Sequence, residues 1–532
     1  MKNIKYIVLA AAMVFATACE QELIETVPAD PDMTNLTPDP CTGSAGSANF
    51  TKFIAIGNSL VAGVQGGALF DEGQANSLAL ILNTQFACVS GGSTFVQPTI
   101  NTPLGFNLFI SPNPTAGGTV LGRMLLQGTP PRPTPQVSNT GAIPNPAVNP
   151  GFIYTGAKSA LNNFSFPAIV LGQSLIPQTG NWAGAGVDPR FNPFYGRLAY
   201  PGTGTSTIIG DAAAAGGTFF LFWLGLDDFF LHAAYGGDPT KAPLTPTGPL
   251  PTGFDGQYAA AVGSLLASNP ELKGVVGNFP NIFAMPHFRS VVWNPIPLDA
   301  ATAAAVTASL ANNYNGFLTA MVGAGIITEQ EKTARILTYF ETNPTGPNNS
   351  ILISDETLTD LSPYMAGPAA ALLPYARARQ TKSTDIIPLS TGTILGTTVG
   401  GDPTKVNGVT VPLGDQYALI PSEIVAIETA RTSFNATVKG MADANPTRLA
   451  FADVNKAYSD FVAAQALVMN NITITPLINP PTGIFSEDGI HPNSRGYAYL
   501  SNIFIEAINT KFGASVPLTN ISKYKATGLP IP

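Results

Sequence analysis

Short apolar runs alternate with helical stretches along much of the chain, and this alternation limits the possible folds more than any other feature. Apolar runs at 53–56 and 218–224 predict buried strands. Further strands are expected near 273–279 and 448–454, with helices before and after them, including one at about 255–268. Strands that alternate with helices build a parallel sheet that helices cover on both faces. The sequence therefore predicts an α/β fold with a mostly parallel central sheet.

Other helices are expected near 71–86 and along two apolar stripes with spacings of three and four residues. The first stripe consists of Val306, Leu310, Tyr314, Phe317 and Met321. The second consists of Ile424, Ile427, Phe434, Val438 and Met441, and is entered through Pro421 and Ser422. We expect both stripes to lie in the hydrophobic core rather than in a ligand site.

Two long segments interrupt the alternation. Residues 98–150 contain many prolines and no clear period, which predicts a long irregular insertion. A second insertion is expected at 297–415, because residues 341–415 are again rich in Pro, Gly and Thr. Long insertions of this kind often form active-site walls. We therefore expect one domain over 51–515, followed by a C-terminal tail at 516–532.

The first residues resemble an export signal. Lys2 and Lys5 precede an apolar run at 6–18, and Cys19 follows three small residues. This arrangement is similar to bacterial lipoprotein signals, in which the cysteine is lipidated; the alternative is an ordinary signal with an incidental cysteine. We expect removal of 1–18, a flexible tether over 19–50, and a lipid anchor at Cys19. The protein would then face the periplasm or the cell surface, anchored in the cell envelope, with the outer membrane favoured.

Cysteine content and charge bear on the disulfide pairing and on the classes of binding partner. Outside the cytoplasm Cys41 and Cys88 either form a disulfide or remain two buried thiols. The chain has only 25 Lys and Arg residues against 33 Asp and Glu residues, a net charge of −8. Nucleic-acid binding depends on cations that neutralise phosphates, so no nucleic-acid partner is expected. Membrane contact is expected only through the anchor.

A histidine base must be His232, His287 or His491, since the chain has three histidines. His287 has no carboxylate within ten residues, and His232 follows the Asp227–Asp228 pair. His491 is the best candidate, because Asp488 lies three residues before it. A turn that holds both residues can place the carboxylate on Nδ1 and leave Nε2 free as a base. Asn493 or Ser494 can then cap a helix that continues to about residue 511.

Ser59 is the candidate nucleophile. It follows the first predicted strand in the sequence Gly57-Asn58-Ser59-Leu60, where Gly57 allows a tight turn. A serine between a strand and a helix is exposed at the carboxyl edge of the sheet. The N-terminus of the following helix would favour negative charge that develops there.

These motifs together resemble the SGNH/GDSL hydrolases. Residues 55–60 resemble the first sequence block of that family, with Asn58 in place of its Asp. The second block is similar to residues 162–168, the Gly-x-Asn-Asp block aligns with 224–228, and residues 488–493 look like the last block. The resemblance spans about 51–511, although the motifs themselves cover only some thirty residues.

The resemblance implies a three-layer α/β/α sandwich of the flavodoxin-like SGNH type and a serine esterase mechanism. Ser59 would attack an ester carbonyl, His491 would act as base and then acid, and Asp488 would orient His491. The oxyanion would be held by the backbone N–H groups of Ser59 and of the second block, at Ala168, and by the side chain at Asp227. Gly91–Gly92 and Gly172 are other candidates for the second-block role.

Two of these positions depart from the family pattern. Ala168 stands where the family has Gly, which preserves a backbone N–H if the conformation tolerates a Cβ. Asp227 stands where an Asn should donate, and an ionised carboxylate has no donor. It could donate only if burial keeps it protonated. We therefore expect Asp227→Asn to raise ester hydrolysis at pH 7, unless Asp228 or an insertion residue supplies the polar group.

The sequence thus favours an exported serine esterase that acts on acyl or acetyl esters of small molecules, carbohydrates or lipids. The alternative is a binding or scaffold lipoprotein that keeps the fold without turnover. A metal-dependent hydrolase has little support, because the histidines lack ligand spacing such as His-Glu-x-x-His. For the same reason no metal is expected. No cofactor is expected either, since no phosphate-binding glycine loop with its Lys is present.

Overall fold

The centre of the molecule is a five-stranded sheet in which all strands run parallel. The computed structural model describes residues 41–90, 94–107, 121–128, 132–137, 152–198 and 204–527. The sheet consists of β1 (Phe53–Gly57), β6 (Asn163–Ser165), β7 (Phe219–Trp223), β8 (Lys273–Gly277) and β13 (Leu449–Ala452). The expected α/β fold with a parallel sheet is confirmed.

The order of the strands places a topological switch point at β1. Across the sheet the order is β6, β1, β7, β8, β13, so the first strand in sequence pairs with the second on one side and the third on the other. Connections leave opposite sides of the sheet at such a point, and ligands of open α/β sheets bind there, beyond the carboxyl ends of the strands. The crevice beyond β1 is therefore where a functional site is expected.

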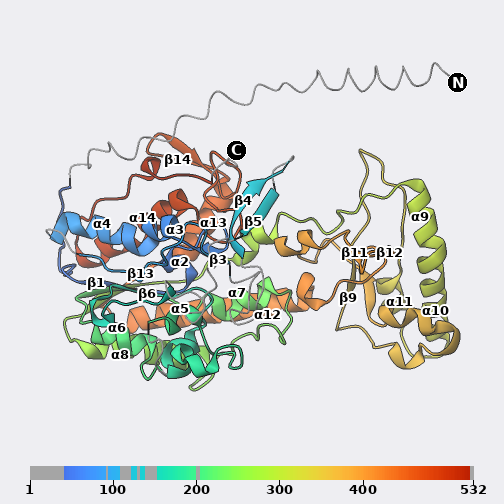
Figure 1. Cartoon of the computed structure of the whole chain (residues 1–532), viewed down its shortest axis with the longest axis horizontal. Helices are drawn as coiled ribbons and strands as arrows, with labels where there is room; N and C mark the ends of the chain where they lie inside the picture. The colour runs from blue at the N-terminus through green and yellow to red at the C-terminus, as the bar shows by residue number, and fades with distance from the viewer. Residues whose placement is uncertain are drawn as a thin grey trace, which may run out of the picture. The chain divides into compact units, whose positions relative to one another are not determined.

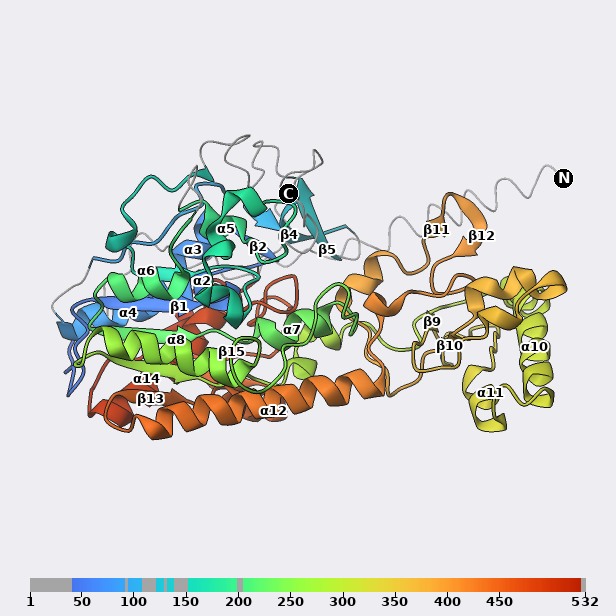
Figure 2. The same ribbon diagram turned by 90° about the horizontal axis from the view of Figure 1, so that it is seen from below.

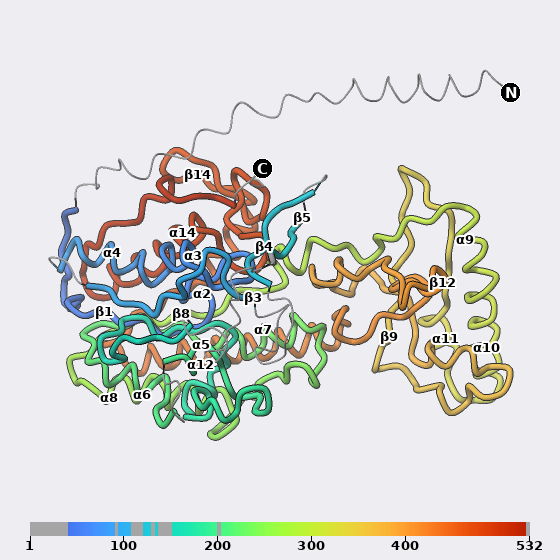
Figure 3. The backbone as a smooth tube through the Cα atoms, in the orientation of Figure 1, coloured from blue at the N-terminus to red at the C-terminus, as the bar shows by residue number. Residues whose placement is uncertain are grey.

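Helices lie on both sides of the sheet (Figure 1). On one side, α4 (Leu78–Ser90) packs against α14 (Ser494–Phe512). Figure 3 shows these two helices, from early and late parts of the chain, side by side. On the other side, α8 (Phe254–Ser268) packs against α6 (Ile208–Ala214) and α12 (Pro421–Ala444), the long helix of Figure 2. This arrangement is compatible with three layers.

Complete burial explains the apolar sequences of the central strands. Every residue of β1 and β7 is buried, because helices cover both faces of the sheet. The second apolar stripe lies on α12, where Ile427, Phe434 and Val438 face the same core. Further helices of this body are α2 (Ser59–Ala62), α3 (Asp71–Ala75), α5 (Pro193–Gly196), α7 (Asp227–Ala234) and α13 (Val454–Ala464).

The single helix expected near 71–86 is two helices, α3 and α4. Ser77 separates them, and its hydroxyl accepts the N–H of Leu80 at the start of α4. A serine that caps a helix start in this way ends one helix and begins another.

The expectation of irregular structure over 98–150 is wrong for residues 106–107, 121–127 and 132–137, which form strands, whereas 98–105 contain no helix or strand. Strand β3 (Phe106–Asn107) pairs with β2 (Ala68–Leu69), and β4 (Leu121–Gln127) forms an antiparallel hairpin with β5 (Arg132–Val137). Met124 of β4 donates its N–H to the carbonyl of Gly66. The hairpin is thus tied to the loop that follows α2.

The second insertion has a hydrophobic core of its own, formed by residues between Ile296 and Ile420. The first apolar stripe lies in this core, which confirms its predicted role. Arg379 is buried there and bridges the carboxylates of Asp355 and Asp385. The elements are α9 (Ala300–Val306), α10 (Asn312–Gly323), α11 (Glu329–Arg335), β9 (Leu352–Ser354), β10 (Ala378–Gln380), β11 (Thr398–Val399) and β12 (Asp402–Val406).

Both ends of the described chain are packed more firmly than expected. A flexible tether up to residue 50 is wrong for 41–50, because Cys41 forms a disulfide with Cys88 and Phe50 stacks on Phe86. In the predicted tail, Ile521 is fully buried. The remaining strands, β14 (Leu467–Met469) and β15 (Ile472–Ile474), form a small hairpin.

The predicted export signal at 1–18, the lipidated Cys19 and the first part of the tether lie outside the described residues. Among the helices that are described, none has the length and apolar character needed to cross a bilayer.

Candidate active site

Ser59, His491 and Asp488 form a continuous chain of hydrogen bonds. The Oγ atom of Ser59 lies 2.9 Å from Nε2 of His491, and Nδ1 of His491 lies 2.6 Å from Oδ2 of Asp488. All three residues are buried, with Ser59 the most accessible at 8%. A carboxylate on Nδ1 fixes the proton there, so Nε2 is free to accept the Ser59 proton. The three candidate catalytic residues therefore have the geometry of a nucleophile, a base and its orienting group.

The turn after β1 positions Ser59. Gly57 ends the strand, and a Cβ at this position would come within 2.3 Å of a Val61 methyl group, so only glycine fits. Asn58 then caps α2, its Oδ1 accepting the N–H of Leu60 at 3.1 Å. Ser59 is the first residue of α2, which places its hydroxyl beyond the carboxyl end of β1.

A tight turn at 486–491 holds Asp488 in place. Its Oδ1 accepts the backbone N–H groups of Ile490 and His491 at 2.8 and 2.9 Å, and the Ser486 hydroxyl at 3.2 Å. Its Oδ2 accepts the N–H of Gly67 in addition to His491. Burial on its own would raise the pKa of Asp488, but His491 and these N–H donors hold it below the usual value. Asp488 is therefore ionised, as the orienting role requires.

His287 supports the same turn from outside. The backbone N–H of His287 donates to the carbonyl of Gly489 at 3.0 Å, and the ring atom Nδ1 lies 3.1 Å from the carbonyl of Asp488. Gly489 has a φ of +69°, and a Cβ there would meet the His287 backbone at 2.8 Å. Burial lowers the pKa of His287, which keeps its ring neutral. His287 is a structural partner of the turn rather than the base.

A small cavity with a free volume of about 10 Å³ opens onto the triad. Small-molecule sites start at about 300 Å³, so this cavity is far smaller and has room for about one water-sized group. Its walls are mainly apolar, and the residues that line it are Ser59, Val64, Gly67, Leu69, Phe106, Pro167, Ala168, Asp227 and His491. Ser59, His491, Ala168 and Asp227 therefore line this pocket, whereas Asp488 lies behind His491.

Two backbone N–H groups at the pocket are free to bind a ligand. Neither the N–H of Ser59 nor that of Ala168 donates a hydrogen bond to any residue that the structure describes. Ala168 has a φ of +51°, the left-handed conformation that favours glycine, although this residue carries a Cβ. Asn192 steadies this loop by donating to the carbonyl of Pro167 at 2.8 Å.

Asp227 uses both carboxylate oxygens to accept hydrogen bonds. Its Oδ1 accepts from Nδ2 of Asn58 at 2.8 Å, and its Oδ2 accepts the N–H of Ile169 at 3.1 Å. Burial raises the pKa of Asp227 to about 6, although these donors and His491 partly offset the effect. At pH 7 the ionised form of the side chain that faces the pocket thus predominates, and this form has no hydrogen to donate.

Asp228 is turned away from the pocket. Its Oδ2 accepts the N–H of Leu171 at 2.8 Å and its Oδ1 accepts the hydroxyl of Thr245 at 2.8 Å. Burial raises its pKa to about 7, and the neighbouring Asp227 adds to this rise. Asp228 therefore does not supply the polar group that Asp227 lacks.

The remaining candidates from the sequence lie elsewhere. The Nδ1 atom of His232 lies 2.8 Å from the carbonyl oxygen of Ala242, and among the described residues His232 forms no hydrogen bond with an aspartate. Gly172 packs against the side chain of Gln257 and does not line the pocket. Gly91–Gly92 lie outside the described residues.

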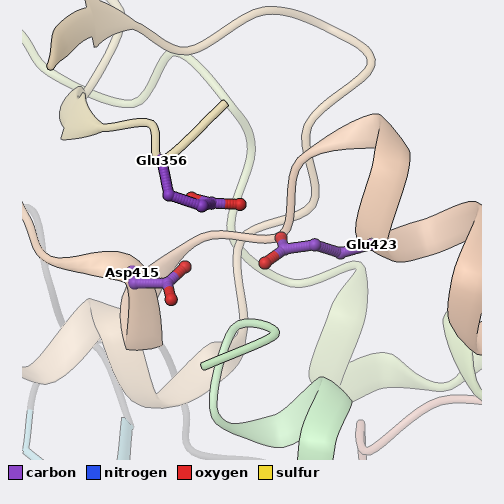
Figure 4. Close-up of side chains that lie close together, drawn as sticks. All are labelled: Glu356, Asp415 and Glu423. Atoms are coloured by element: carbon purple, nitrogen blue, oxygen red, sulfur yellow. The ribbon is translucent and has the colours of Figure 1, made fainter. Parts of the chain in front are cut away.

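A second group of acidic side chains lies apart from the triad. Glu356, Asp415 and Glu423 direct their carboxylates towards a common space (Figure 4), with one oxygen of each within 4.8 Å of the others. Burial, reinforced by their mutual repulsion, raises the pKa of Asp415 to about 7 and that of Glu423 to about 8. Glu423 also accepts the N–H of Ile420 at the start of α12. The described residues offer no other cluster with the geometry to bind a metal.

Sequence reasoning missed three contributions to the site. Ser486 and Gly67 bind Asp488, and His287 holds the carbonyls of the same turn. The contact between Asn58 and Asp227 was also missed, although both positions depart from the blocks that the sequence resembles. That shared departure was the one signal that could have indicated a pair.

The chain has no significant match among protein-family models, curated proteins or solved structures.

Proposed function

We propose that the protein is a serine ester hydrolase of SGNH type. The observation that carries the proposal is the hydrogen-bonded chain from Ser59 through His491 to Asp488, which opens onto a pocket beyond β1. The position of Ser59 at the switch point of a parallel sheet, with the strand order of flavodoxin-like folds, supports the same assignment.

The reaction follows from this geometry. Ser59 Oγ attacks the ester carbonyl carbon and its proton passes to Nε2 of His491. The carbonyl oxygen becomes an oxyanion, which the free N–H groups of Ser59 and Ala168 can stabilise. The intermediate then collapses, and His491 returns the proton to the departing alcohol. Water repeats the sequence on the acyl-serine and releases the acid.

The pocket favours short, uncharged acyl groups. Val64, Leu69, Phe106 and Pro167 give it apolar walls, and its free volume of about 10 Å³ leaves room for no more than a small group. The ionised Asp227 would repel an acyl group that carries its own negative charge. We therefore propose acetyl or other short acyl esters, carried by a small molecule, carbohydrate or lipid.

A series of p-nitrophenyl esters from acetate to octanoate, assayed between pH 5 and 9, tests this function. We expect turnover that is highest for the shortest chains and lost in Ser59→Ala. The matched control is Ser268→Ala, which removes an exposed hydroxyl from the end of α8. If no ester is hydrolysed above the Ser59→Ala background, the protein is instead a binding or scaffold protein that keeps the fold.

We also propose that the protein is exported and anchored by lipid at Cys19. The Cys41–Cys88 disulfide supports export, because disulfides persist in oxidising compartments outside the cytoplasm. Metabolic labelling with a radioactive fatty acid tests the anchor. Label is expected in the wild type and absent from Cys19→Ala, and equal labelling of both would contradict lipidation at this residue.

A further inference from the structure

Asn58 and Asp227 connect the two backbone segments that border the pocket. The Asn58 Nδ2 atom donates to Asp227 Oδ1 at 2.8 Å, and the two side chains are 1% and 4% exposed. Each side chain also accepts a backbone N–H. Asn58 accepts one from its own segment, and Asp227 accepts one from the segment that carries Ala168. Asn58 Oδ1 accepts from Leu60 at 3.1 Å, and Asp227 Oδ2 accepts from Ile169 at 3.1 Å.

The two free N–H groups lie next to these anchored peptides. Ser59 stands between Asn58 and Leu60, and Ala168 directly precedes Ile169. Two hydrogen bonds in series, from Asn58 to Asp227 and from Ile169 to Asp227, thus join the segment that carries the Ser59 N–H to the segment that carries the Ala168 N–H. A shift of either side chain would change the separation of the two N–H groups.

We propose that Asn58 and Asp227 act as one positioning pair, which sets the separation of the Ser59 and Ala168 N–H groups, and that exchanging the two residues would add a third oxyanion donor. This inference rests on the proposed hydrolase function. In the present chain the amide of the pair lies on Asn58, outside the pocket lining, while the carboxylate lies on Asp227, inside it. The pair therefore positions two donors but contributes none.

The hydrogen-bond donors and acceptors around Asn58 and Asp227 require that both residues be substituted together. Two N–H groups point at the Asp227 carboxylate, so in Asp227→Asn the new amide nitrogen faces one of them, donor against donor. In Asn58→Asp two buried carboxylates face each other. In the double variant, the carboxylate introduced at position 58 accepts from the new amide at position 227, whose oxygen still accepts from Ile169. The second hydrogen of that amide is then available on the pocket side.

A double-mutant cycle in thermal stability tests the pairing without reference to activity. The four proteins are the wild type, Asn58→Asp, Asp227→Asn and the double variant that combines both substitutions. The thermal unfolding of each is measured at pH 7. We expect each single variant to lose about 2 °C or more in Tm, Asn58→Asp the most, and the double variant to recover most of that loss. Additive losses would overturn the proposal.

Hydrolysis by the same four proteins tests the effect on the oxyanion. Loss of one such donor typically costs about 10²–10³ in rate, so we expect the double variant to exceed the wild type in kcat by about tenfold or more, with KM little changed. Asp227→Asn should lie between them. A double variant that is folded but no faster than an active wild type would overturn the inference alone. If all four proteins are inactive and Ser59 is unreactive, the proposed function itself fails.

Discussion

The Nε2 atom of His491 lies 2.9 Å from the Oγ atom of Ser59, although 432 positions of sequence separate the two residues. The first strand of the sheet leads into the turn that carries Ser59, and the turn before α14 carries His491. Their meeting within proton-transfer distance is the relationship on which the proposed chemistry depends.

Replacing Asp488 by Asn should cost about 10⁴ in kcat, because an amide no longer selects the tautomer that leaves Nε2 free. Steady-state kinetics on the best p-nitrophenyl ester measure the loss. Asp460→Asn, on the exposed face of α13, is the matched control and should behave as the wild type. A kcat for Asp488→Asn within a few-fold of the wild type would contradict the role assigned to Asp488.

The advantage of Asp227→Asn over the wild type should depend on pH. Burial raises the pKa of Asp227 to about 6, with Asn58, His491 and the Ile169 N–H acting in the opposite direction. Below this value Asp227 is protonated and can donate, whereas above it the carboxylate repels an oxyanion. The ratio of variant to wild-type kcat should therefore rise between pH 5 and pH 8, with a midpoint near 6.

Using the ratio removes the pH dependence that the two enzymes share. A ratio that stays constant over this range would show that Asp227 does not affect the oxyanion through its charge.

The positive φ of Ala168 should make the protein less stable than a glycine variant. The left-handed conformation destabilises a residue with a Cβ by about 1–2 kcal/mol. Glycine avoids this strain, but the greater freedom of its unfolded chain offsets about 0.5–1 kcal/mol of the gain. We expect Ala168→Gly to gain about 0.5–1 kcal/mol in the free energy of unfolding and to keep hydrolytic activity.

Gln465 is the matched control, because it has a φ of +62° at the exposed end of α13, away from the pocket. Gln465→Gly should gain a similar amount. If Ala168→Gly is destabilised while Gln465→Gly is stabilised, the Ala168 methyl group packs favourably enough to outweigh its backbone conformation.

The acidic cluster should make the protein less stable as the pH rises. Burial and the nearby carboxylates of Glu356 and Asp415 raise the pKa of Glu423 to about 8 in the folded state. The folded chain therefore holds a proton that the unfolded chain releases near pH 4–5, so stability falls between about pH 5 and pH 8. Glu423→Gln should reduce this fall in stability, because Gln has no proton to release. Its side-chain oxygen can still accept the Ile420 N–H, as the Glu423 carboxylate does.

Denaturant unfolding at several pH values measures the change, with Glu341→Gln, an exposed position, as the control. An unchanged pH dependence in Glu423→Gln would contradict the raised pKa.

Much of the fold could be predicted because its central strands are long apolar runs buried on both faces, as in β7. Strand β6 was missed, since it has three residues and begins with a polar one, Asn163. The hairpin of β4 and β5 was missed because Pro133 and Pro135 break the alternation that indicates a strand. Local pattern could not find elements whose pairing is decided by partners elsewhere in the chain.

The candidate site divides in the same way. Ser59, Asp488 and His491 could be named because their motifs are local and their order is distinctive. The protonation of Asp227 could not be predicted, since its pKa depends on burial and on Asn58 and Ile169, which come from other segments. The Cys41–Cys88 pairing stayed open for a similar reason, because two cysteines can remain reduced unless the fold brings them together.

The most direct test of the central claim is covalent labelling of Ser59 by a fluorophosphonate probe, read out by mass spectrometry of the tryptic peptides. The account predicts a single labelled serine, Ser59, with labelling abolished in Ser59→Ala and strongly reduced in His491→Ala, while Ser268→Ala labels as the wild type does. A folded wild-type protein that remains unlabelled, or that carries the probe on another serine, would contradict the proposal that Ser59 is an activated nucleophile.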